Sequence, residues 1–566
     1  MQDYAKSLEA FGGRLTMPID CLRSPTESQT PWQFDVLVIG SGYGASICAA
    51  RLSEKMRPGV RLAVIERGKE WVPGTFGDNF LAISKESQRS LFGFDKRSIK
   101  NPIGLLNVVQ GEDVNIMSAS GLGGTSLINA NVAIRADQEL FHQPQWSSCL
   151  SDRQFLDPYY DRAEWELGVA REPVDLTNKM KAQRLAAERL HDEGAHFEGS
   201  VLAITRAPQL GLPIINRQGM IQRPCTSCGD CMTGCNVGAK NTLAMNYLPL
   251  ARRYGAQIFT QTEIDHIEKC NGFYKIHYTH YSNDGVTINQ AHGFTTSRMV
   301  ILGAGSLGST EILLRSQDAN LQFSSQLGCS WSGNGDILGF IRGVDYFTNI
   351  AGTGAKDAVE KLIGPTIQSN VTFPNVTNLY DRVIIQDGVS ASAYNLFVSM
   401  FGRDIGLDHT QVLLLSGHDG GQGKIELDKD RRAVVRWPGM YDIPYRKMAE
   451  DQIRRFSFAL GGKYKELTSF KGRVGTVHPL GGCRIGGDPY SGVTNHKGQV
   501  FDGRANGDID PNTNSFGVHD GLYVVDGASI PTSIGVNPML TISAIAERNA
   551  ELITKEPQYS DLFVTQ

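Results

Sequence analysis

The chemistry of this chain is indicated first by a histidine and an asparagine near its C-terminal end. His478 stands in a glycine-rich turn, HPLGGC at 478–483, and Asn537 precedes a proline in GVNP at 535–538. An imidazole has a pKa suited to taking a proton from a hydroxyl group, and an amide can hold the same oxygen without adding charge. The pair is therefore a candidate for alcohol chemistry, whereas a lone histidine is more often structural or solvent-exposed.

Four closely spaced cysteines form a second candidate centre. They have the spacing C-x2-C-x2-C-x3-C of a ferredoxin-type iron–sulfur run, except that Asn236 stands where proline usually follows. Core packing does not readily explain four thiols in one short segment. An iron–sulfur cluster is the favoured interpretation, with zinc as the main alternative and an unmetallated packing loop as the third. The four are Cys225, Cys228, Cys231 and Cys235, and remote replacements for the fourth ligand are Cys149, Cys270, Cys329 and Cys483.

A cofactor for this chemistry would be held by elements at the other end of the chain. Residues 34–39 (FDVLVI) are typical of a buried parallel strand, and 46–55 carry apolar residues at helical spacing. Between them, GSGYGA at 40–45 fits the G-x-G-x-x-(G/A) dinucleotide fingerprint. A second strand at 60–65 ends on Glu66, whose carboxylate can bind ribose hydroxyls and disfavours a 2′-phosphate. This unit predicts a dinucleotide other than NADP.

The residues of the fingerprint have separate roles. Gly40 permits the tight turn, Gly42 lets the backbone approach a pyrophosphate, and Ala45 allows close helix–strand packing. The N-terminus of the helix adds its dipole and its free N–H groups. A similar strand and glycine turn at 299–308 (MVILGAGSLG) is expected to pack against the first unit without binding a second dinucleotide.

Composition sets the broad class of the protein. The chain has 566 residues, which exceeds what one core usually serves, so two or more domains are expected. Hydrophobic residues make up 41% and charged residues 20%, as in globular proteins. A net charge of −4 gives no footprint for nucleic acid, and no apolar run reaches the roughly 20 residues of a membrane span. Without a secretory signal at the N-terminus, a cytoplasmic protein with reduced thiols is expected.

The remaining segments predict a mixture of helices and sheets. The expected elements are a lid or loop at 70–116, a glycine-rich turn at 118–134, helices within 155–195, a β-meander at 257–298, and a separate sheet at 330–470 that includes RVIIQDG (382–388), NLFVSMF (395–401) and QVLLLSG (411–417).

Together these motifs form a recognisable whole. The match is looser at 150–220 and 340–470, and Ser120 departs from the basic residue or asparagine often found there. The chain resembles the glucose–methanol–choline (GMC) oxidoreductases, most closely their cholesterol-oxidase-like branch, in the fingerprint with Glu66, GLGGTSLIN at 121–129, VILGAGSLGS at 300–309, HPLGGC at 478–483 and VVDGASIPTSIGVNPMLTISAIAERN at 524–549.

The resemblance implies a mixed α/β fold, with an FAD-binding Rossmann-like domain of GMC/glutathione-reductase type and an inserted β-sheet substrate domain. The implied parts are a leader at 1–33, FAD-binding segments at 34–150, 221–325 (with the cysteines and the meander) and 471–566, a cap or substrate region at 151–220, and a substrate-binding domain at 326–470.

The resemblance also implies non-covalently bound FAD, with His478 and Asn537 as the catalytic pair. The residues that it assigns to FAD are Gly40, Gly42, Gly44, Ala45 and Glu66 at the ADP half, Gly123, Gly124 and Asn129 beside the isoalloxazine, Asp526 and Gly527 near the ribitol and pyrophosphate, and Met539 and Leu540, whose N–H groups would face the flavin pyrimidine oxygen.

The implied reaction is oxidation of the CH–OH group of a hydrophobic alcohol, including a steroid-like one, to a ketone or aldehyde. Proton abstraction would accompany hydride transfer to flavin N5, and oxygen or an electron carrier would be the acceptor. A cluster would favour a carrier because it offers a one-electron exit. Two alternatives stay open: a flavin/iron–sulfur electron-transfer subunit, and a GMC-fold flavoenzyme with non-oxidative chemistry.

Isomerisation of a steroid double bond is not expected. By a loose match of local pattern, Gln386 stands where isomerising cholesterol oxidases have a glutamate, and an amide cannot accept and return a proton as a carboxylate can. Asp387 is adjacent, but neighbouring residues of a strand face opposite sides. We therefore expect Asp387 to point away from the substrate cavity.

Overall fold

The structure is a computed structural model. It describes residues 14–23, 30–89, 98–174, 176–206, 212–283, 287–354, 363–395, 406–469, 472–505, 509–510 and 515–564. Much of the expected leader, and residues 396–401 of one expected strand, lie outside these ranges. Within them, none of the helices has both the length and the hydrophobicity needed to cross a bilayer, while the cytoplasmic location stays a prediction.

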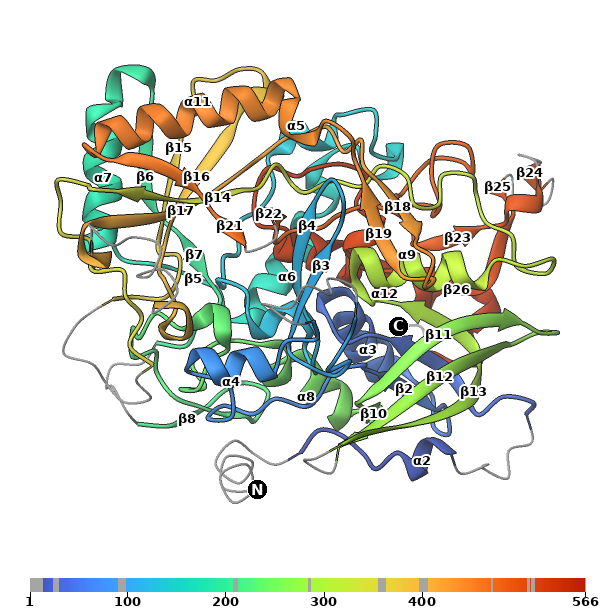
Figure 1. Cartoon of the computed structure of the whole chain (residues 1–566). Coiled ribbons are helices and arrows are strands. Elements are labelled where there is room, and N and C mark those ends of the chain that lie inside the picture. Colours follow the sequence, from blue (N-terminus) through green and yellow to red (C-terminus); the bar gives the residue numbers. More distant parts are fainter. Residues whose placement is uncertain are drawn as a thin grey trace.

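The first sheet has eight strands and is built from three distant parts of the chain (Figure 1). Four parallel pairings join β10 to β2, β2 to β1, β1 to β13, and β13 to β26. The expected meander then extends β13 through antiparallel β12 and β11. The strands are β1 (Phe34–Ile39), β2 (Leu62–Ile65), β10 (Gln257–Phe259), β11 (Thr262–Lys269), β12 (Tyr274–Asn283), β13 (Ile288–Leu302), β23 (Gln499–Phe501) and β26 (Val518–Val524).

The register of this sheet brings three loops to one edge. Ile39 pairs with Leu302, and Leu302 pairs with Val524. Because these three strands are parallel, the loops after their last residues begin side by side. Ligands of open α/β sheets bind at such an edge, so the fold gathers the fingerprint, the second glycine turn and the Asp526 segment there.

Helices cover both faces of the first sheet. On one face, α3 (Tyr43–Lys55) packs against α12 (Met539–Lys555) and α8 (Tyr247–Arg253), and α12 also packs against α6 (Asp157–Leu167). On the other face, α9 (Gly305–Ser316) packs against β11. Residues of β1 alternate between the two cores, with Val36 and Val38 in one and Leu37 and Ile39 in the other, as the period of a strand requires.

The second sheet has six antiparallel strands. Its outer face is covered by α7 (Asn178–Arg189) and α11 (Pro444–Ala459), at the upper left of Figure 1. Leu338 and Leu414 lie on the opposite face, where they cluster with Val477, the residue before His478. The strand order is β20 (Lys463–Glu466), β14 (Ile337–Arg342), β17 (Thr410–Gly417), β16 (Val383–Gly388), β15 (Ser369–Thr372) and β6 (His196–Gly199).

The segment expected to be a lid or loop at 70–116 contains regular structure instead. The sequence missed β3 and β4 because neither strand shows clear alternation of apolar and polar residues. Strand β4 pairs with β22, which leads directly to His478. The smaller elements are α2 (Asp20–Arg23), α4 (Phe80–Lys85), α5 (Gln138–Phe141), β3 (Leu106–Gln110), β4 (Asn115–Ala119), β5 (Ala170–Arg171), β7 (Val201–Leu202), β8 (Ile214–Ile215), β9 (Ile221–Gln222), β18 (Lys424–Leu427), β19 (Ala433–Arg436), β21 (Thr468–Ser469), β22 (Gly472–Thr476), β24 (Ile509–Asp510) and β25 (Ser515–Phe516).

Candidate active site

His478 is held by a buried carboxylate that the sequence did not reveal. Its Nδ1 lies 2.9 Å from Oδ1 of Asp336, and the His478 side chain is 15% exposed while that of Asp336 is fully buried. The same Asp336 carboxylate accepts hydrogen bonds from Ser416 Oγ, Thr476 Oγ1 and the backbone N–H of Val477. Since a carboxylate accepts, Nδ1 donates to it. The other ring nitrogen, Nε2, is thereby left as a proton acceptor.

The turn that carries Asp336 also holds the segment before Asn537. The side-chain oxygen of Asn334 accepts from the backbone N–H groups of Ile534 and Gly535, and its amide nitrogen donates to the carbonyl of Val536. Asn537 itself is buried, and its Oδ1 has no hydrogen-bond partner among the described residues. Residues 332–336 therefore brace both predicted catalytic residues, and no described residue occupies the side-chain oxygen of Asn537.

A second histidine, His418, lies against the loop that precedes Asn537. A Cβ atom built at Gly535 would come within 2.4 Å of Nε2 of His418, so only glycine fits there. Burial lowers the pKa of His418 to about 4. His418 is consequently neutral near pH 7 and packs under the loop without adding charge to it.

The fingerprint turn has the open space that a pyrophosphate needs. Gly40 has φ +92°, and a Cβ there would lie 2.3 Å from the carbonyl oxygen of Gly303. At Gly42, in contrast, the nearest atom to an added Cβ is 3.9 Å away. Helix α3 starts after Gly42 with no side-chain cap, so its first N–H groups are available to an anion. Gly44 packs against the backbone of Val525, and Ala45 packs against Gly303.

Glu66 organises the loops around the fingerprint. Its Oε2 accepts from Ser41 Oγ at 2.6 Å, and its Oε1 accepts from the backbone N–H groups of Gly68 and Gly121. Three of the roughly four acceptor positions of a carboxylate are therefore used. One position remains for a hydroxyl group, as the ribose prediction requires.

The second glycine-rich turn lies directly on the fingerprint. A Cβ at Gly124 would come within 2.9 Å of the Cα of Gly42, and the N–H of Gly123 donates to Ser41 Oγ. These contacts place Gly123 and Gly124 at the fingerprint end of the site. Their expected position beside the isoalloxazine stays a prediction.

Asn129 joins the ends of two helices. Its amide nitrogen donates to the hydroxyl of Tyr43, the first residue of α3, at 2.7 Å and approaches the sulfur of Met539, the first residue of α12, at 3.6 Å. Helix α12 also lacks a side-chain cap, and Leu540 is fully buried in its first turn. Two helix N-termini, each with a positive dipole end, thus converge at Asn129.

Asp526 occupies the N-terminus of α9. One carboxylate oxygen accepts from the backbone N–H of Gly305 and from Ser309 Oγ, and the other accepts from the N–H of Ala528, next to Gly527. The anion-binding position of the second glycine turn is therefore filled by a side chain of the same chain. The expectation that residues 299–308 bind no second dinucleotide stays a prediction.

The four clustered cysteines line a single pocket together with Pro365. Burial raises the pKa of Cys225 to about 12, and a backbone N–H, that of Ser227, points at its sulfur at 3.4 Å. Asn236, which replaces the usual proline, holds residues 74–76 through its side chain. The remote Cys483 is buried elsewhere, against Thr310. It therefore does not line the pocket of the four clustered cysteines.

Lys240 connects the cysteine loop to the loop that ends at Asn129. Its buried ammonium donates to the carbonyls of Leu127 and Asn129 and to that of Cys231, at 3.1, 2.5 and 3.0 Å. Burial lowers the pKa of Lys240 to about 8. One side chain therefore fixes the position of the cysteine run relative to the loop that ends at Asn129.

The second sheet separates Gln386 from Asp387, as predicted. Asp387 forms a fully buried ion pair with Lys179 of α7 at 2.5 Å, on the helix-covered side. Gln386 pairs in register with Leu414 and donates to Asn370 Oδ1 at 2.9 Å. Of Gln386 and Asp387, only Asp387 has a carboxylate, and that carboxylate is bound to Lys179 of α7.

The sequence of this chain is similar to those of several known alcohol and sterol oxidases. A cholesterol oxidase of Mycobacterium tuberculosis is 27% identical over 92% of this chain and 91% of its own length, and one of Acinetobacter baumannii is 25% identical over 94% and 97%. A long-chain-alcohol oxidase of Arabidopsis thaliana is 23% identical over 90% of this chain and 66% of its own.

The fold has a relative of known structure. The crystal structure of pyridoxine 4-oxidase from Mesorbium loti superimposes with a TM-score of 0.59 at 15% identity, covering 93% of this chain and 100% of that one. Sequence models described as GMC oxidoreductase match residues 34–320 and 502–546. The chain therefore belongs to the GMC oxidoreductase family and is an oxidoreductase.

Proposed function

We propose that this protein uses FAD to oxidise the CH–OH group of a hydrophobic alcohol, a sterol or a long-chain alcohol. The relatives act on these two kinds of substrate according to their names, and Val477, next to His478, packs in an apolar cluster that includes Leu338 and Leu414 of the second sheet. The observation that carries the proposal is the hydrogen bond between His478 and buried Asp336, because it prepares one imidazole nitrogen to receive a proton.

The residues around the sheet edge fit FAD. The open position at Gly42 and the uncapped start of α3 suit the pyrophosphate, Glu66 retains an acceptor for the ribose, and the uncapped start of α12 suits the electron-rich end of a flavin ring. When bound, FAD supplies the acceptor for the hydride that leaves the alcohol carbon.

The protein residues handle the proton. Nε2 of His478 accepts the hydroxyl proton, and Asp336 stabilises the imidazolium that results, as the carboxylate of a catalytic triad does. Asn537 donates its amide N–H to the alcohol oxygen and thereby orients it. A positioned base of this kind contributes roughly 10²–10⁴-fold to a rate.

We also propose an iron–sulfur cluster on Cys225, Cys228, Cys231 and Cys235. The pocket that the four cysteines line together supports it. A cluster supplies a one-electron exit, so the proposal favours a dehydrogenase that passes electrons to a carrier over an oxidase that reduces oxygen. Lys240 gives this centre a direct structural link to the loop of Asn129.

The test is anaerobic reduction of the bound flavin by a panel of alcohols. Cholesterol, a long-chain primary alcohol and a short diol are each added to the purified protein, and bleaching of the flavin bands is followed with analysis of the carbonyl product. We expect bleaching by a hydrophobic member and loss of that bleaching in His478→Ala at unchanged flavin content. Bleaching at the wild-type rate in His478→Ala, or reduction only by a protein donor, would refute the proposed function.

A further inference from the structure

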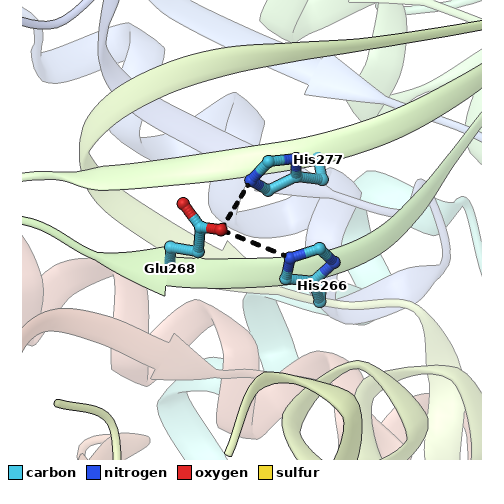
Figure 2. A group of neighbouring side chains, drawn as sticks. All are labelled: His266, Glu268 and His277. Atoms are coloured by element: carbon cyan, nitrogen blue, oxygen red, sulfur yellow. Dashed lines mark ion pairs between the residues drawn. The ribbon is translucent and has the colours of Figure 1, made fainter. Parts of the chain in front are cut away.

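Two histidines and a glutamate meet on the solvent side of the β11–β12 hairpin, far along the chain from His478. His266 and Glu268 are two residues apart on β11, so they share one face of the strand. His277 of β12 stands directly opposite His266 in the register. Figure 2 shows the three side chains converging from the two strands, and the two imidazole rings stack 4.3 Å apart at an angle of 6°.

The distances between the ligand atoms suit one metal ion. Oε1 of Glu268 lies 3.1 Å from Nε2 of His277 and 3.7 Å from Nε2 of His266, and all three atoms lie within 4.8 Å of one another. With metal–ligand bonds of about 2.1 Å, the edges of a coordination shell are roughly 3.0–3.4 Å. Small side-chain rotations therefore bring the three atoms onto one ion.

A carboxylate behind the group orients one of its ligands. Asp265 Oδ2 lies 2.8 Å from Nδ1 of His266, and its other oxygen pairs with Arg315 of α9 at 3.3 Å. The register shifts between Ile264 and His266, and such a bulge re-aims side chains. Because Nδ1 of His266 donates to this carboxylate, its Nε2 keeps a free lone pair, which is the arrangement common around metal-binding histidines.

The second histidine is also poised for a ligand. Nε2 of His277 is buried and has no hydrogen bond of good geometry among the described residues, although it faces Glu268. The side chains of His266, His277 and Glu268 are 31%, 26% and 42% exposed, so an ion can reach them from solvent. Lys275 approaches only the other oxygen of Glu268, at 3.5 Å, and leaves Oε1 to the histidines.

We propose that His266, Glu268 and His277 form a binding site for one divalent transition-metal ion of the Zn²⁺ or Ni²⁺ type. Imidazole and carboxylate together suit these ions, and water completes the coordination. The ion cross-links β11 to β12 on the outside of the meander. This site is independent of the cysteines and of the proposed alcohol chemistry.

The test is calorimetric titration of Ni²⁺ into the full-length flavoprotein after treatment with a chelator. We expect wild type to bind one more equivalent of Ni²⁺ than His277→Gln and than Glu268→Gln. The matched control is His292→Gln on neighbouring β13, a histidine whose Nδ1 contacts Thr279 at 3.0 Å, and it should bind as much Ni²⁺ as wild type. The cysteines are present in every variant, so the difference of one equivalent reports the hairpin site alone.

A second variant tests the geometry of the site. Asp265→Asn should keep the stoichiometry and weaken Ni²⁺ binding about 10–100-fold, the usual effect of losing a carboxylate behind a ligating histidine. Flavin absorbance and the melting temperature establish that each variant is folded. Equal Ni²⁺ stoichiometry in wild type, His277→Gln and Glu268→Gln overturns the proposal.

Discussion

Replacement of Asp336 by asparagine tests the catalytic geometry most directly. The amide keeps the shape of the side chain but exchanges one acceptor oxygen for an N–H donor. One oxygen of Asp336 now faces His478 and Ser416, and the other faces Thr476 and the backbone N–H of Val477. The backbone N–H of Val477 can only donate, whereas an imidazole can change its tautomer. The amide oxygen therefore stays at Val477, and the new N–H group turns to His478.

The consequence of this orientation is a misplaced proton on the imidazole. To accept from the new N–H, Nδ1 of His478 must lose its hydrogen, and Nε2 must then carry it. A protonated Nε2 cannot take the hydroxyl proton of the alcohol. We expect the flavin reduction rate to fall about 10²–10⁴-fold, which is about 2.7–5.4 kcal/mol at about 1.36 kcal/mol per decade.

The measurement is stopped-flow reduction of the flavin under anaerobic conditions with saturating alcohol. Ser416→Ala is the matched control, because it removes one hydrogen bond from Asp336 and leaves the bond to His478 in place. We expect that control to reduce flavin at nearly the wild-type rate, and both variants to keep their flavin and their affinity for the alcohol. A wild-type reduction rate in a folded Asp336→Asn protein would show that the tautomer argument is wrong.

Three further outcomes check the other assignments. Gly42→Val should remove bound flavin although the chain itself leaves room for a Cβ atom there, and a yellow variant with full FAD content would contradict the fingerprint assignment. Cys228→Ser should remove both iron and acid-labile sulfide from anaerobically purified protein, whereas stoichiometric zinc without sulfide in wild type would instead identify a structural zinc site. Incubation with a 3β-hydroxy-5-ene steroid should give no enzymatic 4-en-3-one, because Gln386 cannot shuttle a proton and Asp387 is bound by Lys179; formation of that product faster than in a control without enzyme would defeat this prediction.

The sequence predicted the parts of the site that depend on local pattern. Strand β1 begins and ends where its apolar run does, at Phe34 and Ile39, and the glycine turn after it has the expected tight geometry at Gly40. The placement of Asp387 on the helix-covered face of the sheet also followed from the alternation of a strand. In each case a few consecutive residues contain the physical cause.

The parts that escaped prediction depend on contacts between distant segments. Asp336 meets His478 across 142 residues, and Asn334 meets Ile534 across 200. The residues around them, SGNGDI, show no spacing that relates them to either partner. Their roles arise only when β14 and β22 bring the two segments together, and one sequence contains no record of such pairing.

The distances along the chain have a consequence for biosynthesis. Tyr43 and Met539, which touch through the tyrosine hydroxyl, are 496 residues apart. At about 5–20 residues per second, a ribosome needs roughly 25–100 s to make the intervening chain. During that time α3 has no α12 to cover its apolar face. The nascent chain therefore keeps this surface uncovered until the C-terminal helix is made, and the site that we propose for FAD is complete only when synthesis has almost finished.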